Sequence, residues 1–475
     1  MRAAACAFAL FTTACAVGPN FHRPEAPRGD SFDARGDAKT TVEADGRTQK
    51  LVPGANVVAD WWRLFGSTAV NATISRAVAN NPNLEATRAS LRRSKDLMRA
   101  GYGAFFPQAD AQFGGAYQQV SALKFGQSTP PVDFGLYTLS GTISYTIDIW
   151  GGQRRQVESL AAQVDAARAT LDGAYVMLCG NVISALVARA AYRAQADATR
   201  EIVTLERDQL HVTEAQATGG TVPYANVLSI RSQIASTEAL VPQLEQKADE
   251  QDHLVAALVG ETPASFVAPR IALAEFALPT EVPVSLPSKL VRQRPDILIA
   301  EAQLHAANAL IGVATAAMLP NITLSATAGA NNTSLDNLFA PNGLFGSVGA
   351  GLTQPLFHGG TLANQRRAAV SARDQAFATY KQTVLAAFEQ VADTLRALEH
   401  DAEQLKVAKE AVDAAEEASR LVEANYRSGI ANYLQVIIAN EQLVQAKITY
   451  LQSVAQRLQD TIALYVALGG GWWNA

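Results

Sequence analysis

Side chains that commonly do chemistry occur in this 475-residue sequence, but they are not grouped as an active site requires. Histidine, a frequent metal ligand and general base, occurs six times without the H-E-x-x-H spacing of a helical metal site. There is no G-x-S-x-G turn for a nucleophilic serine and no glycine-rich phosphate loop. The sequence therefore predicts no catalytic residue, no metal site and no cofactor. The histidines are His22, His211, His253, His305, His358 and His400.

Cys15 is the residue best placed for a covalent modification. One arginine, Arg2, precedes a short apolar run over 3–11 and then small residues, which is the pattern of a secretory signal. A cysteine directly after small residues is typical of a bacterial lipobox, in which the thiol is acylated once residues 1–14 are removed. We therefore predict lipidation at Cys15. Cys179 would then be the one remaining thiol, so no intramolecular disulfide is expected in the exported chain.

The composition excludes several classes of protein. Hydrophobic residues make up 48% of the chain and charged residues 17%, which is typical of a folded protein. The formal net charge is −5, whereas a nucleic-acid-binding protein would carry a basic stripe, so we expect no nucleic acid partner. No run approaches about 18 uninterrupted apolar residues, so we expect no transmembrane helix.

Two very long helices must position the other elements. Residues 153–220 contain no proline, and their apolar residues alternate steps of four and three, which predicts a supercoiled helix about 100 Å long. A helix of that length does not fit inside one compact domain. A second pattern, with a period of seven, predicts an equivalent helix between Gly360 and Gly429. The first pattern comprises Leu160, Val164, Ala167, Leu171, Ala174 and Leu178, and the second comprises Phe377, Val384, Val391, Leu398, Leu405 and Val412.

Each long helix is predicted to turn tightly into another helix. Gly219 and Gly220 end the first, and a proline opens the helix predicted over 223–259. Glycine after one helix end and proline at the next helix start are typical of a helical hairpin. Gly429 ends the second long helix, and the last helix is predicted over 432–468.

A β-hairpin precedes each long helix. Within 105–149 and 319–357, apolar and polar side chains alternate with a period of two, which predicts strands with one apolar and one polar face. The alternation is most regular over 137–149. Asp110 and Asp148 fall on the polar face, so both are expected to face water.

The order helix, strand, strand, long helix, helix occurs twice. An offset of 213 places Pro82 on Pro295, and an offset of 209 places Tyr224 on Tyr433, so one unit is written twice. We assign the chain to these segments: a signal peptide at 1–14, a lipid-anchored extended arm at 15–66, a first repeat at 67–262, a connector at 263–287, a second repeat at 288–469 and a tail at 470–475.

Four amphipathic strands are too few to close a barrel, and their open edges need partners. In a membrane the requirement is strict, because an open edge cannot be hydrated there. Three copies of the chain would supply twelve strands, which is a reasonable pore size. The predicted fold is therefore mixed α+β: a duplicated unit of long coiled-coil helices and β-hairpins in a trimeric twelve-stranded transmembrane β-barrel. The alternative, a small soluble sheet packed on the helices, does not explain why two hairpins lead into two such helices.

Short motifs follow one another along almost the whole chain. They are Cys15–Phe21, Asp60–Trp62, Arg294–Asp296 with Ala300, Glu301 and Leu304, Gly312–Ala314, Gln354–Phe357, Gly429 with Tyr433 and Leu434, and Ala467–Trp472. In type and order they resemble the TolC-like outer-membrane channel family, and within it the lipoprotein branch (NodT/OprM-like) that serves resistance-nodulation-division pumps. The resemblance implies a homotrimer whose barrel lies in outer-membrane lipid of a Gram-negative bacterium and continues into a periplasmic α-helical barrel. It also implies a passive exit duct that docks to a periplasmic adaptor (membrane fusion) protein and an inner-membrane pump.

The resemblance also assigns roles to the glycine turns. In that family these turns form the periplasmic mouth, where the pore narrows and the adaptor docks. Gly219, Gly220 and Gly429 are therefore expected to form docking tips. Tyr426 matches a tyrosine of the family near the same mouth.

The mouth also departs from the family pattern. Many members carry aspartates just after the turns, where they form acidic rings in the closed mouth. Gln435, Ile438 and Asn226 occupy those positions here, so no acidic ring is expected. We predict instead an apolar closure by Leu434 and Ile438, with Tyr426 bracing the helices.

Two other functions are consistent with parts of the pattern. A non-channel periplasmic coiled-coil scaffold or adaptor lipoprotein would also carry long helical hairpins, but not two duplicated units with amphipathic β-hairpins. An enzyme would require the grouped catalytic residues that the sequence lacks. Conductance in planar bilayers would separate the three classes.

Overall fold

The computed structural model describes residues 16–27, 29, 31–121, 126 and 130–474. The predicted signal peptide and Cys15 lie outside these residues. The chain forms two compact units, each assembled from separate stretches of sequence. Of the described residues, the first unit contains those within 16–23, 91–167 and 300–380, and the second contains those within 24–90, 168–299 and 381–474.

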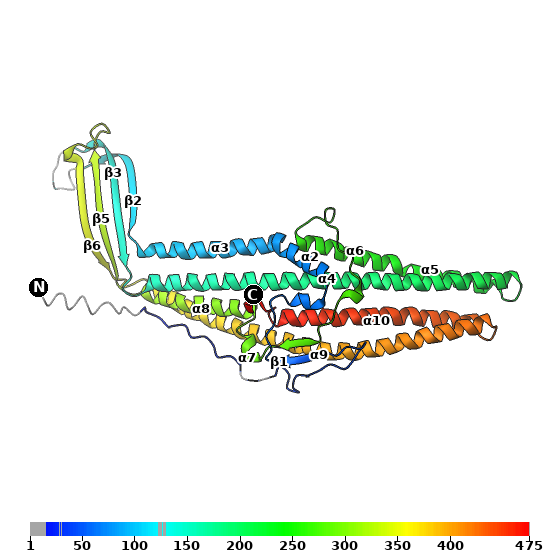
Figure 1. Ribbon diagram of the computed structural model, residues 1–475. Helices are drawn as coiled ribbons and strands as arrows, with labels where there is room; N and C mark the ends of the chain where they lie inside the picture. The colour runs from blue at the N-terminus through cyan, green and yellow to red at the C-terminus, as the bar shows by residue number, and fades with distance from the viewer. Residues whose placement is uncertain (1–15, 28, 30, 122–125, 127–129, 475) are drawn as a thin grey trace. The chain divides into compact units, whose positions relative to one another are not determined.

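A four-stranded antiparallel sheet is the centre of the first unit (Figure 1). Its strands are β2 (Gln108–Val120), β3 (Val132–Ile147), β5 (Asn321–Asn332) and β6 (Leu344–Thr353), in the order β2-β3-β5-β6. β3 pairs with β5, so the hairpins of the two repeats join into one sheet. β2 and β6 are therefore its edge strands.

Each pair of strands begins and ends a few residues inside the predicted hairpin, at 108–147 instead of 105–149 and at 321–353 instead of 319–357. A 3-10 turn, η2 (Gly103–Phe105), precedes β2, and another, η5 (Pro341–Gly343), precedes β6. At the far end β6 stops at Thr353, just before Pro355. Proline has no amide hydrogen to donate to a neighbouring strand, so it ends the pairing.

The strand register confirms the two predicted faces. Residues directly opposite each other in a ladder share a face, and Ile143 lies opposite both Ala109 and Ala326. On the other face, the Thr142 hydroxyl lies 3.2 Å from that of Thr327. One face is consequently apolar in all four strands, and the other carries mainly hydroxyl, amide and glycine positions.

Two helices of 67 residues each, α4 (Gly152–Thr218) and α9 (Thr361–Arg427), follow the hairpins and confirm the predicted pair. Their length corresponds to about 100 Å. The helices that precede the hairpins are α3 (Pro82–Tyr102) and α8 (Pro295–Ala316), and all four helices contribute residues to both units. In α9 the predicted period-seven positions from 384 to 412 are buried, while Phe377 is exposed.

The second unit holds the main hydrophobic core. Its further helices are η1 (Trp61–Phe65), α2 (Thr68–Asn80), α5 (Tyr224–Glu238), α6 (Leu240–Val259), η4 (Leu273–Glu275), α7 (Pro287–Leu290), α10 (Tyr433–Ala467) and η6 (Trp472–Asn474). Fully buried Trp61 stacks on Tyr465 with ring centroids 5.1 Å apart, so the Asp60–Trp62 motif packs against the last long helix. The single helix predicted over 223–259 is instead two, because α5 ends at Glu238 and α6 begins at Leu240.

A two-stranded sheet in the second unit was missed by the sequence prediction. β1 (Lys50–Pro53), in the predicted extended arm, pairs in parallel with β4 (Glu281–Val284), in the predicted connector. Leu51, Val282 and Val284 are buried in the main core. Strands of four residues separated by more than 200 positions give no local periodicity, so only the tertiary contact reveals them.

Two helices among the described residues have an 18-residue window apolar enough, by composition alone, to cross a membrane. They are α4 and α8, and half of each window is buried within the chain. The expectation of no transmembrane helix considered only uninterrupted runs of apolar residues. A helix can reach this mean hydropathy over 18 residues without such a run.

Candidate functional site

The turn after α4 has the geometry of a Schellman motif. The amide of Gly220 donates to the carbonyl of Ala217 at 3.1 Å, and the amide of Thr221 donates to that of Gln216 at 3.0 Å. Gly220 has a φ of +73°, a left-handed conformation that side chains with a Cβ disfavour. Of the two predicted tip glycines, Gly220 therefore makes the turn, and Gly219 is the last residue before it.

The turn after α9 repeats this geometry at the offset of 209. Gly429 has a φ of +77°, and its amide donates to the Tyr426 carbonyl at 3.0 Å. The amide of Ile430 donates to the carbonyl of Asn425 at 2.8 Å. Both turns are exposed, and Ile430 exposes 78% of its surface. The duplication thus produces two matching tips, each with an exposed backbone turn.

Tyr426 is buried and connects the two long helices. Its hydroxyl donates to Oε1 of Gln216 at 2.8 Å and lies 3.2 Å from Oγ1 of Thr213. Both partners are on α4, whereas Tyr426 is in the last turn of α9. The sequence predicted a bracing tyrosine, and the structure supplies the hydrogen bonds through which it would act.

Leu434 and Ile438 lie in the first turns of α10, and both are exposed in the single chain, by 60% and 44%. The described residues therefore leave much of the apolar surface of both side chains uncovered. They are available for contacts with other copies, as an apolar closure would require. Asn226 is half-buried, and its amide donates to the carbonyl of Pro223 in the turn that starts α5.

Gln435 has a local structural role that the sequence prediction missed. Oδ1 of Asn432 accepts a hydrogen bond from the backbone N–H of Gln435 at 3.1 Å. In return, Oε1 of Gln435 accepts one from the backbone N–H of Asn432 at 3.0 Å. This reciprocal pair is a capping box at the start of α10. The spacing N-x-x-Q was visible in the sequence and could have indicated the cap. The side-chain oxygen of Gln435 therefore already accepts a hydrogen bond within the chain.

The carboxylates nearest the tips are paired with arginines. Glu214 accepts from Arg231 at 2.8 Å, and Glu423 accepts from Arg427 at 2.5 Å. Among the described residues, no three His, Cys, Asp or Glu side chains gather as a metal site. Cys179 is buried in α4, and burial raises the pKa of its thiol to about 12, so the thiol is held in its unreactive neutral form.

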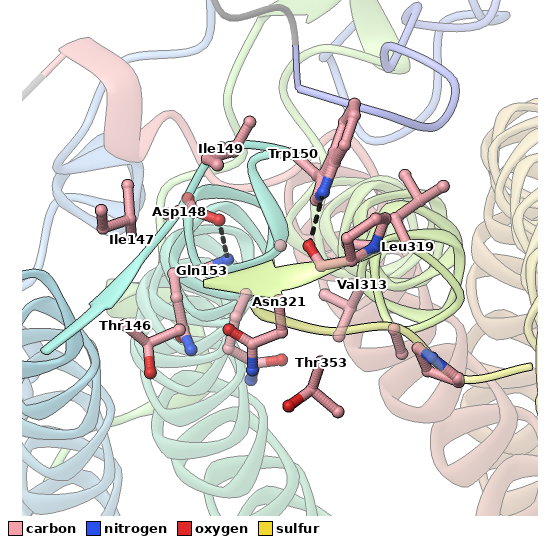
Figure 2. A pocket seen from close by; sticks show the side chains of 16 residues that line it. Thr146, Ile147, Asp148, Ile149, Trp150, Gln153, Val313, Leu319, Asn321 and Thr353 are labelled. Carbon is pink, nitrogen blue, oxygen red and sulfur yellow. Dashed lines mark hydrogen bonds between the residues drawn. The ribbon is translucent and has the colours of Figure 1, made fainter. Parts of the chain in front are cut away.

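Asp148 corrects one prediction, because it does not lie on a strand face. β3 ends at Ile147, and the Asp148 carboxylate accepts a hydrogen bond from the backbone amide of Gln153 at 3.1 Å (Figure 2). It also accepts one from the backbone amide of Arg154 at 3.0 Å. A carboxylate at this position satisfies free amides at the start of α4 and complements the helix dipole. Asp148 therefore caps the long helix where it leaves the sheet.

The same junction contains a pocket of about 490 Å³ (Figure 2). It is lined by the ends of the strands, the start of α4 and the end of α8. Trp150 closes part of it, and its indole N–H donates to the carbonyl of Pro320 at 2.8 Å. Thr146, Asn321 and Thr353 point polar groups into the region shown. This hydrogen bond joins the segment through which the first repeat leaves β3 to the segment through which the second repeat enters β5.

Arg155 holds the chain segment that follows Cys15. Its buried guanidinium donates to the carbonyl of Val17 at 3.2 Å, to Asn20 at 2.7 Å and to Glu158 at 2.7 Å. A cation in the first turn opposes the helix dipole, which is a sequence signal that this arginine needs partners. The sequence prediction did not use that signal.

Arg294 explains the Arg294–Asp296 motif. Its guanidinium pairs with Asp296 at 2.7 Å, and it also donates to the side chain of Gln390 and the carbonyl of Ala467, both at 2.9 Å. These partners lie on α8, α9 and α10. One buried guanidinium therefore ties three helix segments of the second unit together.

Residues 73–261 and 286–470 match the family model described as outer membrane efflux protein. The two matched stretches correspond to the two repeats. Curated relatives of known name are similar over most of their length. The pyoverdine export outer membrane protein OpmQ of Pseudomonas aeruginosa is 29% identical over 88% of this chain and 88% of its own. Nodulation protein T of Rhizobium leguminosarum bv. viciae is 27% identical over 99% of this chain and 94% of its own.

Solved structures share the fold. The outer-membrane channel OprN superposes with a TM-score of 0.87 and 25% identity, covering 96% of this chain and all of its own. The CmeC outer membrane channel of Campylobacter jejuni has a TM-score of 0.83 at 18% identity, covering 96% of this chain and 95% of its own, which shows the fold alone. These channels confirm the predicted mixed α+β fold of long helices and β-hairpins.

Proposed function

Since the chain belongs to the outer membrane efflux protein family, we propose that three copies close one twelve-stranded barrel and form the exit duct of a tripartite efflux system. The sheet carries this proposal. One of its faces is apolar, and the outer edges of β2 and β6 pair with no other strand among the described residues. A three-fold assembly pairs β2 of one copy with β6 of the next and leaves no edge exposed to lipid.

The apolar face supports a lipid environment. Large side chains on it are exposed in the single chain, among them Phe113 by 60%, Val348 by 89% and Leu352 by 68%. Exposed apolar surface of this extent on a sheet is unfavourable in water and favourable in the hydrocarbon of a bilayer. The polar face, with its threonine and serine hydroxyls, then lines the water-filled lumen.

The helices would continue the duct into the periplasm. α4 and α9 each fold back at a matched tip into α5 and α10, and three copies supply enough hairpins for a tunnel wall. The tips at Gly219, Gly220 and Gly429 would dock a periplasmic adaptor protein. An inner-membrane pump of the resistance-nodulation-division class would then drive export, and this chain would conduct passively.

Two local features complete the proposal. Acylation of Cys15 would anchor the chain in outer-membrane lipid, and Arg155 would fix the segment that follows the anchor. At the mouth, Leu434 and Ile438 would meet their counterparts in the other copies and exclude water. An apolar constriction gates by dewetting, and needs no charged ring.

Conductance of the purified protein in planar bilayers tests the channel directly. The trimer is tested by pairing Gln112→Cys on β2 with cysteines placed one at a time on the polar face of β6. We expect a covalent trimer for at least one pair. As a matched control, Thr142→Cys with Thr327→Cys should form a disulfide within one chain, because these residues lie opposite each other. Monomeric protein without conductance would contradict the proposal.

A further inference from the structure

The four strands of the sheet carry very little charge. β2, β3, β5 and β6 contain no lysine, arginine or histidine, and their two acidic residues are Asp110 and Asp133. A wall of hydroxyl, amide and glycine groups has no preference for the sign of a passing ion. Any selectivity by charge in this part of the chain must therefore come from these two carboxylates.

The register places the two carboxylates on opposite faces. Asp110 lies opposite Thr142, which in turn lies opposite Thr327, and the hydroxyls of these threonines are 3.2 Å apart. Asp110 is therefore on the polar face. Asp133 lies opposite Gln119, an odd number of positions from Thr142, so it belongs to the apolar face near the hairpin end. Asp110 is the single charged residue on the polar face of these strands.

The surroundings of Asp110 leave its carboxylate free to act at a distance. Asp110 is exposed, and its neighbours across the sheet at the same level are Thr142 and Thr327. The strands opposite it offer hydroxyls and small side chains, none of which carries a compensating positive charge.

On the basis of the proposed trimer, we infer that Asp110 is the charge filter of the barrel. Three-fold symmetry places three Asp110 carboxylates at one level of the lumen. Their combined negative potential raises the local concentration of cations and lowers that of anions. The barrel therefore favours cationic and neutral cargo and retards anionic cargo.

The size of the barrel decides how the ring acts. Twelve strands about 4.8 Å apart and tilted by about 40° give a backbone radius of about 12 Å. Carboxylates that far apart cannot share one ion, so the ring acts through its field rather than by coordination. The Debye length is about 10 Å at 0.1 M salt, comparable with the lumen, and about 3 Å at 1 M. The filter must therefore weaken as the salt concentration rises.

Reversal potentials across a planar bilayer in a potassium chloride gradient test the inference. The wild-type channel should pass potassium in preference to chloride, and more so in dilute salt. Asp110→Asn should bring the permeability ratio close to one, and Asp110→Lys should reverse it. Asp133→Asn is the matched control and should leave the ratio unchanged. Adding Thr142→Asp to Asp110→Asn restores a carboxylate at the same register position and should restore cation preference.

The outcomes separate the inference from the proposed function. Heat-resistant trimers of each variant, seen on gels, show that the barrel has assembled. Open channels whose selectivity is the same in wild type and Asp110→Asn would overturn the charge filter and leave the duct intact. Absence of any conductance from assembled wild-type trimer would overturn the duct itself.

Discussion

The hydroxyl of Tyr426, in the last turn of α9, donates a 2.8 Å hydrogen bond to Oε1 of Gln216 near the end of α4. The two residues are 210 positions apart in sequence, and each lies within four residues of a tip glycine. The bond therefore connects the two repeats at the ends of the long helices, where the duct is proposed to close. A rearrangement of the tips has to break it or carry both helices together.

The gate is tested by removing both the brace and the apolar contact. Tyr426→Ser with Leu434→Ser should raise single-channel conductance, because the tip helices lose their connection and the constriction becomes wettable. Tyr426→Phe removes only the hydroxyl and should give a smaller increase. Tyr224→Ser changes an exposed tyrosine in the first repeat and should have no effect. If the double variant conducts like wild type, closure is held elsewhere along the tunnel.

The uncharged mouth predicts a weak response to trivalent cations. Asn226, Gln435 and Ile438 supply no carboxylate, and the Gln435 oxygen already caps α10. Trivalent cations added from the tip side should therefore reduce the conductance of wild type only slightly. Gln435→Asp, which can still accept a hydrogen bond at the cap position, should create strong block. Strong block of the wild type would refute the uncharged mouth.

The strand faces predict opposite results for two neighbouring substitutions. Ile143→Arg puts a charge on the lipid side and should cost about 2–4 kcal/mol near the membrane midplane. Thr142→Arg points into water and should be tolerated. The measurement is the amount of heat-resistant trimer in outer membranes. Equal amounts for the two variants would show that β3 does not separate lipid from water.

The predicted acylation of Cys15 can be tested with labelled fatty acid. Cys15→Ser should abolish the incorporation of labelled fatty acid, because the second mature cysteine, Cys179, is buried and its thiol stays neutral. The barrel should keep most of the variant in the outer membrane. Cys179→Ser is the control and should be labelled like wild type. Labelling that persists in Cys15→Ser would exclude this cysteine as the acylated residue.

The Asp401 carboxyl predicts a pH dependence of stability. Burial, and then the neighbouring Asp460, raise its pKa from 3.8 to about 8, while the charge of Arg457 acts in the opposite direction. The folded chain therefore holds a proton that the unfolded chain releases. The stability this contributes is complete below about pH 4 and is lost as the pH rises through about 8.

Thermal unfolding of the trimer checks this dependence. The Tm of wild type should fall between pH 4 and pH 8, and Asp401→Asn should fall less, because an amide does not titrate. Asp413→Asn replaces an exposed aspartate of the same helix and should follow wild type. Parallel curves for wild type and Asp401→Asn would show that this carboxyl does not set the dependence.

Periodicity made much of the fold predictable from sequence. The two 67-residue helices, the two hairpins and the sequence offsets between the repeats all follow from local patterns of period 3.5 and period two. The glycines of the two tips could also be identified locally, because the left-handed residue that ends a helix is usually glycine. The apolar and polar sides of each strand were likewise encoded by alternation alone.

Contacts between distant segments were decided only by the tertiary structure. The β1–β4 pair and the clamps of Arg155 and Arg294 join residues that no local pattern relates. Asp148 appeared by parity to be a strand residue, but the backbone had already turned and its carboxylate caps α4. Asp110 and Asp133 look alike in the sequence. They differ in role because the strand register, fixed by pairing across the whole sheet, assigns one to each face.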